Sequence, residues 1–300
     1  MNIRIWIKAF RLRTLPLALS SAILGSFLAY AQGTFQWKIL ILATTTTLFL
    51  QILSNLANDY GDAMHGIDSI YRLGPGRVTQ SGLVTKKQMR FMISLFVTLS
   101  LASGSLLIFT GLHHIGWKTI LVFFLLGVSA IFAAIKYTVG KNPYGYIGLG
   151  DIFVFIYFGI VGVAGTYYLH VNTFDPWILL PSSAIGLLSS GVLNLNNMRD
   201  IENDARSGKR TLVVYIGKQA AKIYHLMLIS LSILFSLVYT FVHFNSFYQF
   251  LFILTCPLFV LNVIVVMKNT EPGELNKELK KLALSTFAFS VTFGLGLILP

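Results

Sequence analysis

The composition of this chain of 300 residues excludes a soluble globular domain, because 55% of its residues are hydrophobic and only 11% are charged, whereas soluble domains carry about 25% charged residues. A single cysteine, Cys256, excludes a disulfide framework and a cysteine metal cluster. The formal net charge is +12, but the basic residues are spread over several short loops, which excludes a nucleic-acid-binding patch. We therefore expect an integral membrane protein that lies in the lipid bilayer.

The N-terminal residues 1–13, MNIRIWIKAFRLR, alternate basic and bulky apolar side chains. This pattern is typical of a helix in the headgroup region, so we expect a cytoplasmic interfacial segment here. The apolar run 15–31 follows and is close to the ~20 residues that a bilayer needs. Both segments together resemble a secretory signal peptide with Ala29-Tyr30-Ala31 as a cleavage-like site. We interpret them as an uncleaved first helix.

Eight further apolar runs follow, each near the ~20 residues of a membrane-spanning helix. They cover residues 37–57, 89–111, 117–137, 151–169, 176–194, 224–243, 247–267 and 280–299. The sequence therefore predicts an all-α, polytopic membrane protein with nine transmembrane helices, organised as one domain over residues 1–300.

The distribution of basic residues predicts the orientation, because lysine and arginine in short loops are retained on the cytoplasmic side. One alternate set of connections, together with the N-terminal tail, holds all but two of the 23 basic residues. The opposite set holds only Lys38 and Lys118. We therefore predict a cytoplasmic N-terminus and an external C-terminus, with the second and sixth helices ending on the cytoplasmic face.

Two polar stretches, residues 55–68 (NLANDYGDAMHGID) and 194–211 (NLNNMRDIENDARSGKRT), end those two helices. They hold six of the eleven acidic residues. Charged side chains are costly in or beside hydrocarbon, so this concentration indicates function. At helical spacing each stretch presents one polar face, and we expect the two faces to meet across a cavity. The residues of these faces are Asn55, Asp59 and Asp62 in the first stretch, and Asn196 or Asn197, Asp200 and Asp204 in the second.

A weak internal repeat supports this pairing. Each stretch is followed by a polar loop that contains Gly76-Arg77 or Gly208-Lys209-Arg210, and then by an outward helix. In membrane folds such repeats often place a site at their interface. The loop 69–88 also contains Gly74-Pro75-Gly76, and we expect it to form an ordered cap over the site.

Two groups of carboxylates with arginine and lysine nearby match the needs of a diphosphate bound through Mg²⁺, which takes one or two carboxylates together with substrate phosphates. The metal and the cations would stabilise a diphosphate leaving group and leave an electrophilic carbon behind. If that carbon belongs to an allylic prenyl chain, the lipid-facing helices would accommodate its tail, and aromatic side chains would shield a cation.

Other interpretations of these residues remain open from the pattern alone. Acids at helix ends beside basic residues are also typical of solvated interfacial charge. Asp62 or Asp200 would suit an ion-coupled transporter, in which intramembrane acids bind protons or Na⁺. Against a transporter, the acids lie at the mouth of the bundle among basic residues. His65 would suit a metal, although a hydrogen-bonding loop residue is the simpler interpretation.

The chain resembles the UbiA superfamily of intramembrane prenyltransferases over nearly its whole length, since residues 58–62 (NDYGD) and 200–204 (DIEND) are similar to its two aspartate-rich motifs. Within it, residues 58–68 (NDYGDAMHGID), 143–151 (PYGYIGLGD) and 208–212 (GKRTL) are similar to signatures of the 1,4-dihydroxy-2-naphthoate prenyltransferases of menaquinone synthesis. The resemblance implies nine helices around a cytoplasm-facing cavity, a bacterial inner membrane location, and Mg²⁺ as cofactor.

The resemblance also implies roles for individual side chains. Mg²⁺ binding and catalysis fall to four carboxylates, those of Asp59, Asp62, Asp200 and Asp204. Binding of diphosphate oxygens falls to Arg77, Lys209, Arg210, Asn55, Asn58 and Asn197. Acceptor binding falls to Asp151, Lys141 and Tyr144, although capping of the fifth helix explains Asp151 equally well.

The chain departs from the superfamily pattern at two places. Gly66 stands where the first motif often has its third acid, and Asp68 follows two residues later, which puts Asp68 in doubt as a metal ligand. Asn196 and Asn197 stand where the second motif suggests further acids, so Asp200 and Asp204 carry most of its role.

The implied reaction transfers a polyprenyl group from polyprenyl diphosphate to 1,4-dihydroxy-2-naphthoate, with loss of CO₂ and diphosphate, and gives demethylmenaquinol. The alternative acceptor is another aromatic acid such as 4-hydroxybenzoate, which is attacked at a hydrogen-bearing carbon and keeps its carboxylate.

Overall fold

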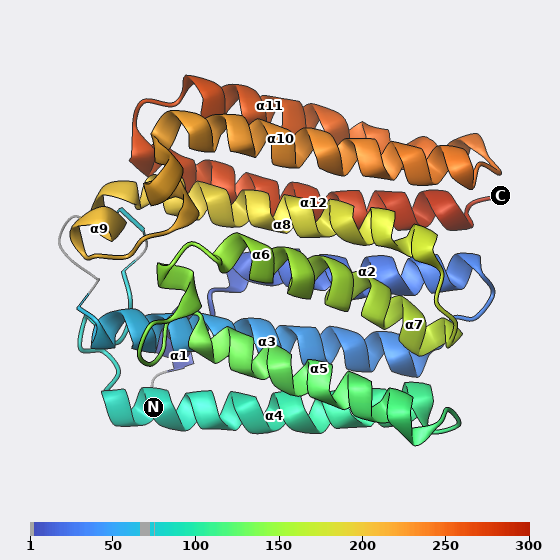
Figure 1. Ribbon diagram of the computed structural model, residues 1–300, viewed down its shortest axis with the longest axis horizontal. Coiled ribbons are helices and arrows are strands. Elements are labelled where there is room, and N and C mark those ends of the chain that lie inside the picture. Colours follow the sequence, from blue (N-terminus) through green and yellow to red (C-terminus); the bar gives the residue numbers. More distant parts are fainter. Residues whose placement is uncertain (1–2, 67–72, 75) are drawn as a thin grey trace.

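The computed structural model describes residues 3–66, 73–74 and 76–300, and the regular elements of these residues are all helices (Figure 1). Nine helices in this part of the chain are long and apolar enough to cross a membrane. The predicted all-α, nine-helix membrane architecture is confirmed.

The N-terminal half of the chain supplies the first four spans. Its elements are α1 (Ile3–Phe10), the 3-10 turn η1 (Leu12–Thr14), α2 (Leu15–Ala31), α3 (Trp37–Met64), α4 (Lys86–Leu112), α5 (Trp117–Lys136) and the 3-10 turn η2 (Tyr144–Tyr146). The fifth span joins α6 (Gly150–Val154), the π-helical segment η3 (Phe155–Gly165) and α7 (Thr166–Val171).

The remaining spans form the C-terminal half. Its elements are η4 (Pro176–Ile178), α8 (Leu179–Arg199), α9 (Ile201–Arg206), α10 (Leu212–Val242), η5 (Phe247–Thr255), α11 (Cys256–Lys268), η6 (Pro272–Glu274) and α12 (Leu275–Ile298). The π-helical segment η3 packs closely on α8, where a Cβ on Gly159 would lie 2.6 Å from the Ser182 carbonyl oxygen.

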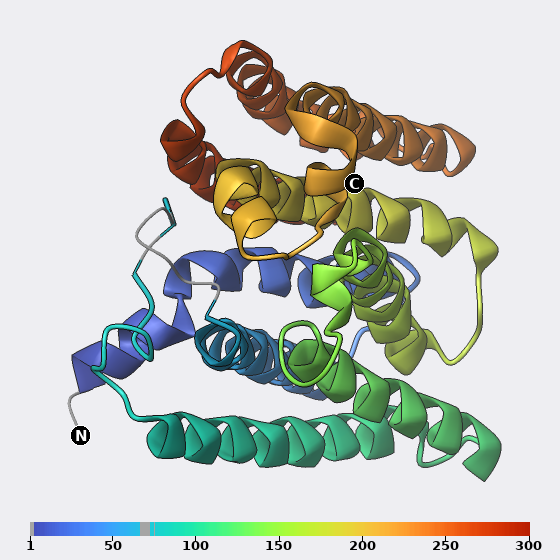
Figure 2. The same ribbon diagram turned by 60° about the vertical axis from the view of Figure 1, so that its left-hand side comes forward.

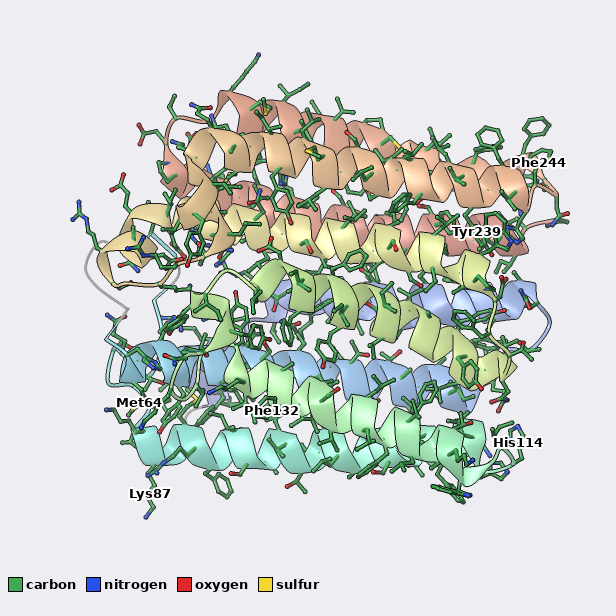
Figure 3. All side chains as sticks on the ribbon, viewed as in Figure 1. Met64, Lys87, His114, Phe132, Tyr239 and Phe244 are labelled. Carbon is green, nitrogen blue, oxygen red and sulfur yellow. The ribbon has the colours of Figure 1, made fainter. Side chains whose placement is uncertain are left out.

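The two ends of the bundle can be told apart by the residues and elements that reach them. Met64 and Lys87 lie at one end, and His114 and Phe244 lie at the other (Figure 3). The C-terminus lies at the end of His114 and Phe244, whereas α9 lies at the end of Met64 (Figures 1 and 3). Helix α3, which carries the first acidic stretch, and α8, which leads into the second, therefore end at the same end of the bundle, as predicted.

The N-terminal segment begins with a separate short helix, α1. Arg11 adopts left-handed backbone angles, φ 51° and ψ 59°, and breaks the chain between α1 and α2. Trp6 and Ala9 face inward and join a core that includes Leu53 and Leu56 of α3. The other face of α1 remains exposed, with Ile3 at 71%.

Helix α10 begins earlier than the hydropathy pattern predicts. The prediction placed its start near residue 224 and assigned Lys218 and Lys222 to a loop, but the structure places both within α10 (Leu212–Val242). The Lys222 ammonium is buried and donates to the carbonyls of Met267 and Asn269, at 3.0 and 2.8 Å. Because the end of α11 provides these acceptors, a charged residue fits inside a packed helix.

Candidate active site

Tyr146 connects the two acidic stretches. Its hydroxyl donates a hydrogen bond to the Asp62 carboxylate. The Lys209 ammonium lies 5.7 Å from the centre of its ring, and its carbonyl accepts a 2.9 Å hydrogen bond from the amide of Arg210. One residue of the loop before α6 thus holds the first and second stretches against each other. Figure 2, in which this end of the bundle is turned forward, shows α9 and that loop at the same end of the bundle.

Helix α3 continues unbroken through Asn55, Asp59 and Asp62, so the predicted i, i+4, i+7 face is confirmed. Gly61 permits this end of α3 to lie close to the connection that follows α5. A Cβ at Gly61 would lie 2.5 Å from the Thr138 carbonyl oxygen. The close approach brings the loop that carries Tyr146 onto the acidic face.

Asp62 forms a buried ion pair with Arg77. The Arg77 guanidinium also donates to the carbonyl of Asn58. Only 2% of Asp62 and 7% of Arg77 are exposed, so each charge depends on its partner, because an isolated buried charge is strongly destabilising. The structure therefore brings together the predicted carboxylate and the predicted basic residue of the following loop.

Asp59 orders the loop that carries Arg77. Its two carboxylate oxygens accept hydrogen bonds from the backbone amides of Val78 and Thr79, at 3.0 and 3.1 Å. The part of the loop around these residues is therefore fixed to the end of α3, and the cap over the site stays a prediction. Residues 67–72 and 75, and with them Asp68, lie outside the described residues.

The second stretch is divided at Asp200, which ends α8 and precedes α9 (Ile201–Arg206). Arg199 is buried and pairs with the Asp200 carboxylate, to which its Nε donates at 3.0 Å. The same guanidinium donates to the side-chain oxygens of Asn196 and Asn276, both at 2.8 Å. Arg199 thus balances the charge of Asp200 and links α8 to α12.

Asp204 and Lys209 form the second ion pair of this stretch, with Nζ 3.2 Å from Oδ2. Both side chains are buried. Burial raises the pKa of the Asp204 carboxyl; the Lys209 ammonium opposes this rise, and the carboxylates of Asp200 and Asp62 add to it. Asp62 of the first stretch therefore acts electrostatically on Asp204 of the second, so the two predicted acidic faces share one electrostatic environment.

Tyr146 also has a raised pKa. Burial is the largest cause, and the negative charge of Asp62 and its hydrogen bond add to the rise, while Arg77 opposes it. The hydroxyl therefore stays protonated at neutral pH and acts as a hydrogen-bond donor to the carboxylate.

The three predicted asparagines have different surroundings. Asn55 donates to the Phe10 carbonyl at 2.9 Å and to the Thr14 hydroxyl at 3.1 Å, so it anchors the N-terminal segment. Asn58 accepts from the Thr138 hydroxyl at 3.2 Å. Asn197 is 2% exposed, and its buried Oδ1 has no hydrogen-bond partner in the structure. It is one of several such atoms among the described residues, and an amide oxygen is a hydrogen-bond acceptor that a ligand could use.

The three predicted acceptor residues make separate contacts. Asp151 is buried in α6, and its carboxylate accepts a 3.3 Å hydrogen bond from the Tyr224 hydroxyl of α10. The N-cap of α6 is Leu149, so Asp151 is not the cap itself. Tyr144 donates to the Ala133 carbonyl at 2.8 Å. The side chain of Lys141 is exposed, as is that of Arg210.

Comparison with known proteins identifies the family. Residues 18–290 match the UbiA prenyltransferase family. The chain belongs to this family. It is 42% identical to the 1,4-dihydroxy-2-naphthoate octaprenyltransferase of Haemophilus influenzae, over 99% of this chain and 97% of that protein. The enzyme of the same name from Escherichia coli is 40% identical, over 98% of this chain and 95% of its own.

Solved structures of UbiA homologues share the fold at low sequence identity. A homologue from Aeropyrum pernix K1 without ligand has a TM-score of 0.68 at 17% identity and covers 96% of this chain and 98% of its own. A homologue from Archaeoglobus fulgidus, with bound GPP and Mg²⁺, has a TM-score of 0.59 at 15% identity and covers 96% of this chain and 99% of its own.

The donor set of this UbiA-family site fits Mg²⁺. It offers carboxylate oxygens and the unpartnered amide oxygen of Asn197, and hard oxygen donors are what Mg²⁺ prefers. Within the described residues, no three His, Cys, Asp or Glu side chains are gathered closely enough to hold a metal by themselves. Arg77, Arg199 and Lys209 balance the carboxylates instead. Such a site suits a cation that arrives together with a polyanion and shares its coordination with phosphate oxygens.

The sequence does not identify two residues of this site, Tyr146 and Arg199. Tyr146 lies within residues 143–151, a stretch that the sequence singles out, but spacing alone does not show that it touches Asp62. Arg199 directly precedes Asp200, but the sequence pattern shows it only as one of the basic residues of a connection. His65 accords with its simpler interpretation, since its Nδ1 lies 2.8 Å from the Gly61 carbonyl oxygen and its ring packs on Tyr146.

Proposed function

We propose that this UbiA-family protein transfers a polyprenyl group from polyprenyl diphosphate to 1,4-dihydroxy-2-naphthoate and releases diphosphate and CO₂. One observation carries the proposal: Tyr146 joins two buried acidic stretches with their basic partners, in a chain 42% identical to an enzyme named for this reaction. The membrane-spanning helices suit a donor whose tail is insoluble in water.

In this proposal Asp59, Asp62, Asp200 and Asp204 would hold Mg²⁺, and Asn197 Oδ1 would be a further oxygen donor. When bound, the metal supplies charge stabilisation for the diphosphate leaving group. Asp59 additionally keeps the loop that follows α3 in place through the amides of Val78 and Thr79.

The basic residues bind the diphosphate oxygens directly. Arg77 and Lys209 are held at the site by Asp62 and Asp204. Both are buried, so they act in a low-dielectric setting where each contact is worth more than in water. Arg210 and Asn58 lie at the edge of the same site and bind outer oxygens, whereas Asn55 supports the site by holding the N-terminal segment.

The bond changes balance without an added base. The bond between C1 of the donor and its bridging oxygen breaks, and diphosphate leaves with the electron pair. Carbon 2 of the naphthoate forms a bond to C1. The bond from that carbon to the carboxylate then breaks, and its electron pair restores the aromatic ring as CO₂ departs. Asp151 contacts the acceptor, together with Tyr144 and Lys141 from the preceding loop.

We further propose that the end of the bundle bearing the site faces the cytoplasm of a bacterium, in the inner membrane. Nearly all of the 23 basic residues lie in the connections that the sequence pattern assigns to this end or in the helix ends beside them, and such residues are retained in the cytoplasm. The water-soluble acceptor and Mg²⁺ would then reach the site from the cytoplasm.

The proposal is tested by incubating the purified protein with Mg²⁺, a polyprenyl diphosphate and a panel of aromatic acids. The expected result is Mg²⁺-dependent diphosphate release that requires 1,4-dihydroxy-2-naphthoate. A preference for 4-hydroxybenzoate would reject the acceptor, and ion flux without diphosphate release would reject the enzyme in favour of a transporter.

A further inference from the structure

A cavity of about 280 Å³ lies between the N-terminal segment and the loop that follows α3. One wall consists of N-terminal residues, the basic Lys8, Arg11 and Arg13 and the apolar Ile7 and Leu12. The opposite wall consists of Asp59, Gly76 and Val78. The cavity thus adjoins the candidate active site, but its charged lining comes mainly from a segment to which the proposed reaction assigns no residue.

The backbone around this cavity is strained in a way that shapes it. Arg11 has φ 51°, a left-handed conformation that costs a non-glycine residue free energy and that clusters at ligand clamps. The break at Arg11 turns the chain between α1 and α2. As a result, residues on both sides of the break, among them Lys8 and Arg13, line one cavity.

The lining carries an excess of positive charge. Among the described residues that line it, three are basic, Lys8, Arg11 and Arg13, and one is acidic, Asp59. Both oxygens of this carboxylate already accept hydrogen bonds, from the amides of Val78 and Thr79. Lys8 reaches across the cavity, since a Cβ on Gly76 would lie 3.9 Å from its Nζ. A ligand with a compact anionic group matches this lining.

The position of the cavity indicates where the anion comes from. The segment that supplies the cations also exposes large apolar side chains: Ile3 is 71% exposed, Leu12 51% and Ile7 43%. A short helix with basic residues and exposed aliphatic residues inserts at the headgroup level of a bilayer. Basic pockets beside membrane helices on the cytoplasmic side are suited to anionic headgroups.

We propose that this cavity binds the phosphate of an anionic phospholipid from the surrounding bilayer. The phosphate lies among Lys8, Arg11 and Arg13, and the acyl chains run along Ile7 and Leu12. Because Asp59 and Val78 form the opposite wall, the bound lipid braces the loop that carries Arg77. The anionic lipid is thereby a structural partner of the site, separate from the prenyl donor.

Binding is measured on the full-length protein in detergent by native mass spectrometry, with phosphatidylglycerol titrated as the ligand and phosphatidylcholine as the zwitterionic comparison. Phosphatidylglycerol should bind more tightly. Lys8→Gln should weaken this binding about fivefold, and Lys8→Gln with Arg11→Gln more than tenfold, because each basic residue near a membrane surface contributes on that scale. Lys8→Arg should retain it.

Lys280→Gln is the matched control, because Lys280 is an exposed lysine in the first turns of α12. It should leave binding unchanged, and the thermal unfolding midpoint of each variant without added lipid should stay near that of the parent. Equal effects of Lys8→Gln and Lys280→Gln would overturn the proposal, because they indicate unspecific charge attraction.

Two further arms separate other sources of phosphate. Inorganic phosphate added in excess should not displace phosphatidylglycerol, because it lacks the apolar contacts with Ile7 and Leu12; displacement would assign the cavity to a free anion and reject the lipid.

The KM for the prenyl donor should be the same for Lys8→Gln and the parent when both are saturated with phosphatidylglycerol. A raised KM there would make the cavity part of the donor site and reject a separate lipid. Failure of the proposed transferase reaction would leave the mass-spectrometric result unaffected.

Discussion

Asp62→Asn tests how one carboxylate serves both stability and turnover. The substitution keeps the shape of the side chain and removes its charge. Asp62 pairs with Arg77 and accepts from Tyr146, so the change removes the carboxylate partner of the buried Arg77, which keeps its hydrogen bond to the Asn58 carbonyl. Breaking a buried ion pair at one partner costs about 3–5 kcal/mol, and the remaining contact places the expected loss near 3 kcal/mol.

The effect on turnover has a separate physical cause. Asp62 is a proposed Mg²⁺ ligand, and loss of one strong electrostatic contact in a buried site lowers the rate about 100-fold or more. A second substitution separates the two effects. Asp62→Asn combined with Arg77→Met also removes the buried cation that has lost this carboxylate, so stability should return to within about 1 kcal/mol of the parent, while turnover stays low.

The assays are Mg²⁺-dependent diphosphate release and the midpoint of thermal unfolding, measured for both single variants and for the double variant in the same lipid. Tyr146→Phe, which removes only the hydroxyl, is the comparison variant and should reduce turnover less than Asp62→Asn does. Turnover of Asp62→Asn within a few fold of the parent, at unchanged Mg²⁺ dependence, would refute Asp62 as a ligand.

Three further predictions concern other parts of the site. Asn197→Leu should raise the unfolding midpoint, because an unsatisfied buried oxygen costs about 1–3 kcal/mol, yet it should lower turnover; a stable and fully active variant would show that Asn197 binds no ligand. Arg210→Gln should raise the KM for the diphosphate donor by only a few fold, since its side chain is exposed, and a loss as large as that of Asp62→Asn would contradict the edge position. Reporter fusions after Lys87 and Lys209 should read cytoplasmic and a fusion after Gly116 external, and an external signal at Lys209 would place the site on the wrong side of the membrane.

Much of the fold follows from the sequence because membrane helices have strong signals. Apolar runs near the length of a bilayer predict nine spans, and the described residues contain nine such helices. The start of α10 was misplaced because hydropathy treats Lys218 and Lys222 as loop residues. Their ammonium groups instead donate hydrogen bonds to carbonyls near the end of α11. Hydropathy averaged over a short window of sequence cannot show such a contact between distant segments.

The sequence predicts the two acidic faces of the site but not the hydrogen bonds that connect them to the surrounding loops. The spacing of Asn55, Asp59 and Asp62 gave their shared face, and the helix confirms it. Their partners depend on how the loops fold back: Val78 and Thr79 cap Asp59 through backbone amides, which carry no side-chain signature. Tyr146 bridges the stretches from the connection between two other spans, and only packing reveals such a link.

The release of CO₂ from labelled acceptor tests the central claim most directly. Purified protein is supplied with Mg²⁺, a polyprenyl diphosphate and 1,4-dihydroxy-2-naphthoate labelled in its carboxyl group, and labelled CO₂ and diphosphate are followed together. The proposed reaction predicts that both appear in equal amounts and that the prenylated product, after oxidation, is a label-free demethylmenaquinone. A prenylated product that keeps the label would contradict attack at the carboxylate-bearing carbon, and the absence of prenylated product with this acceptor would contradict the naphthoate assignment altogether.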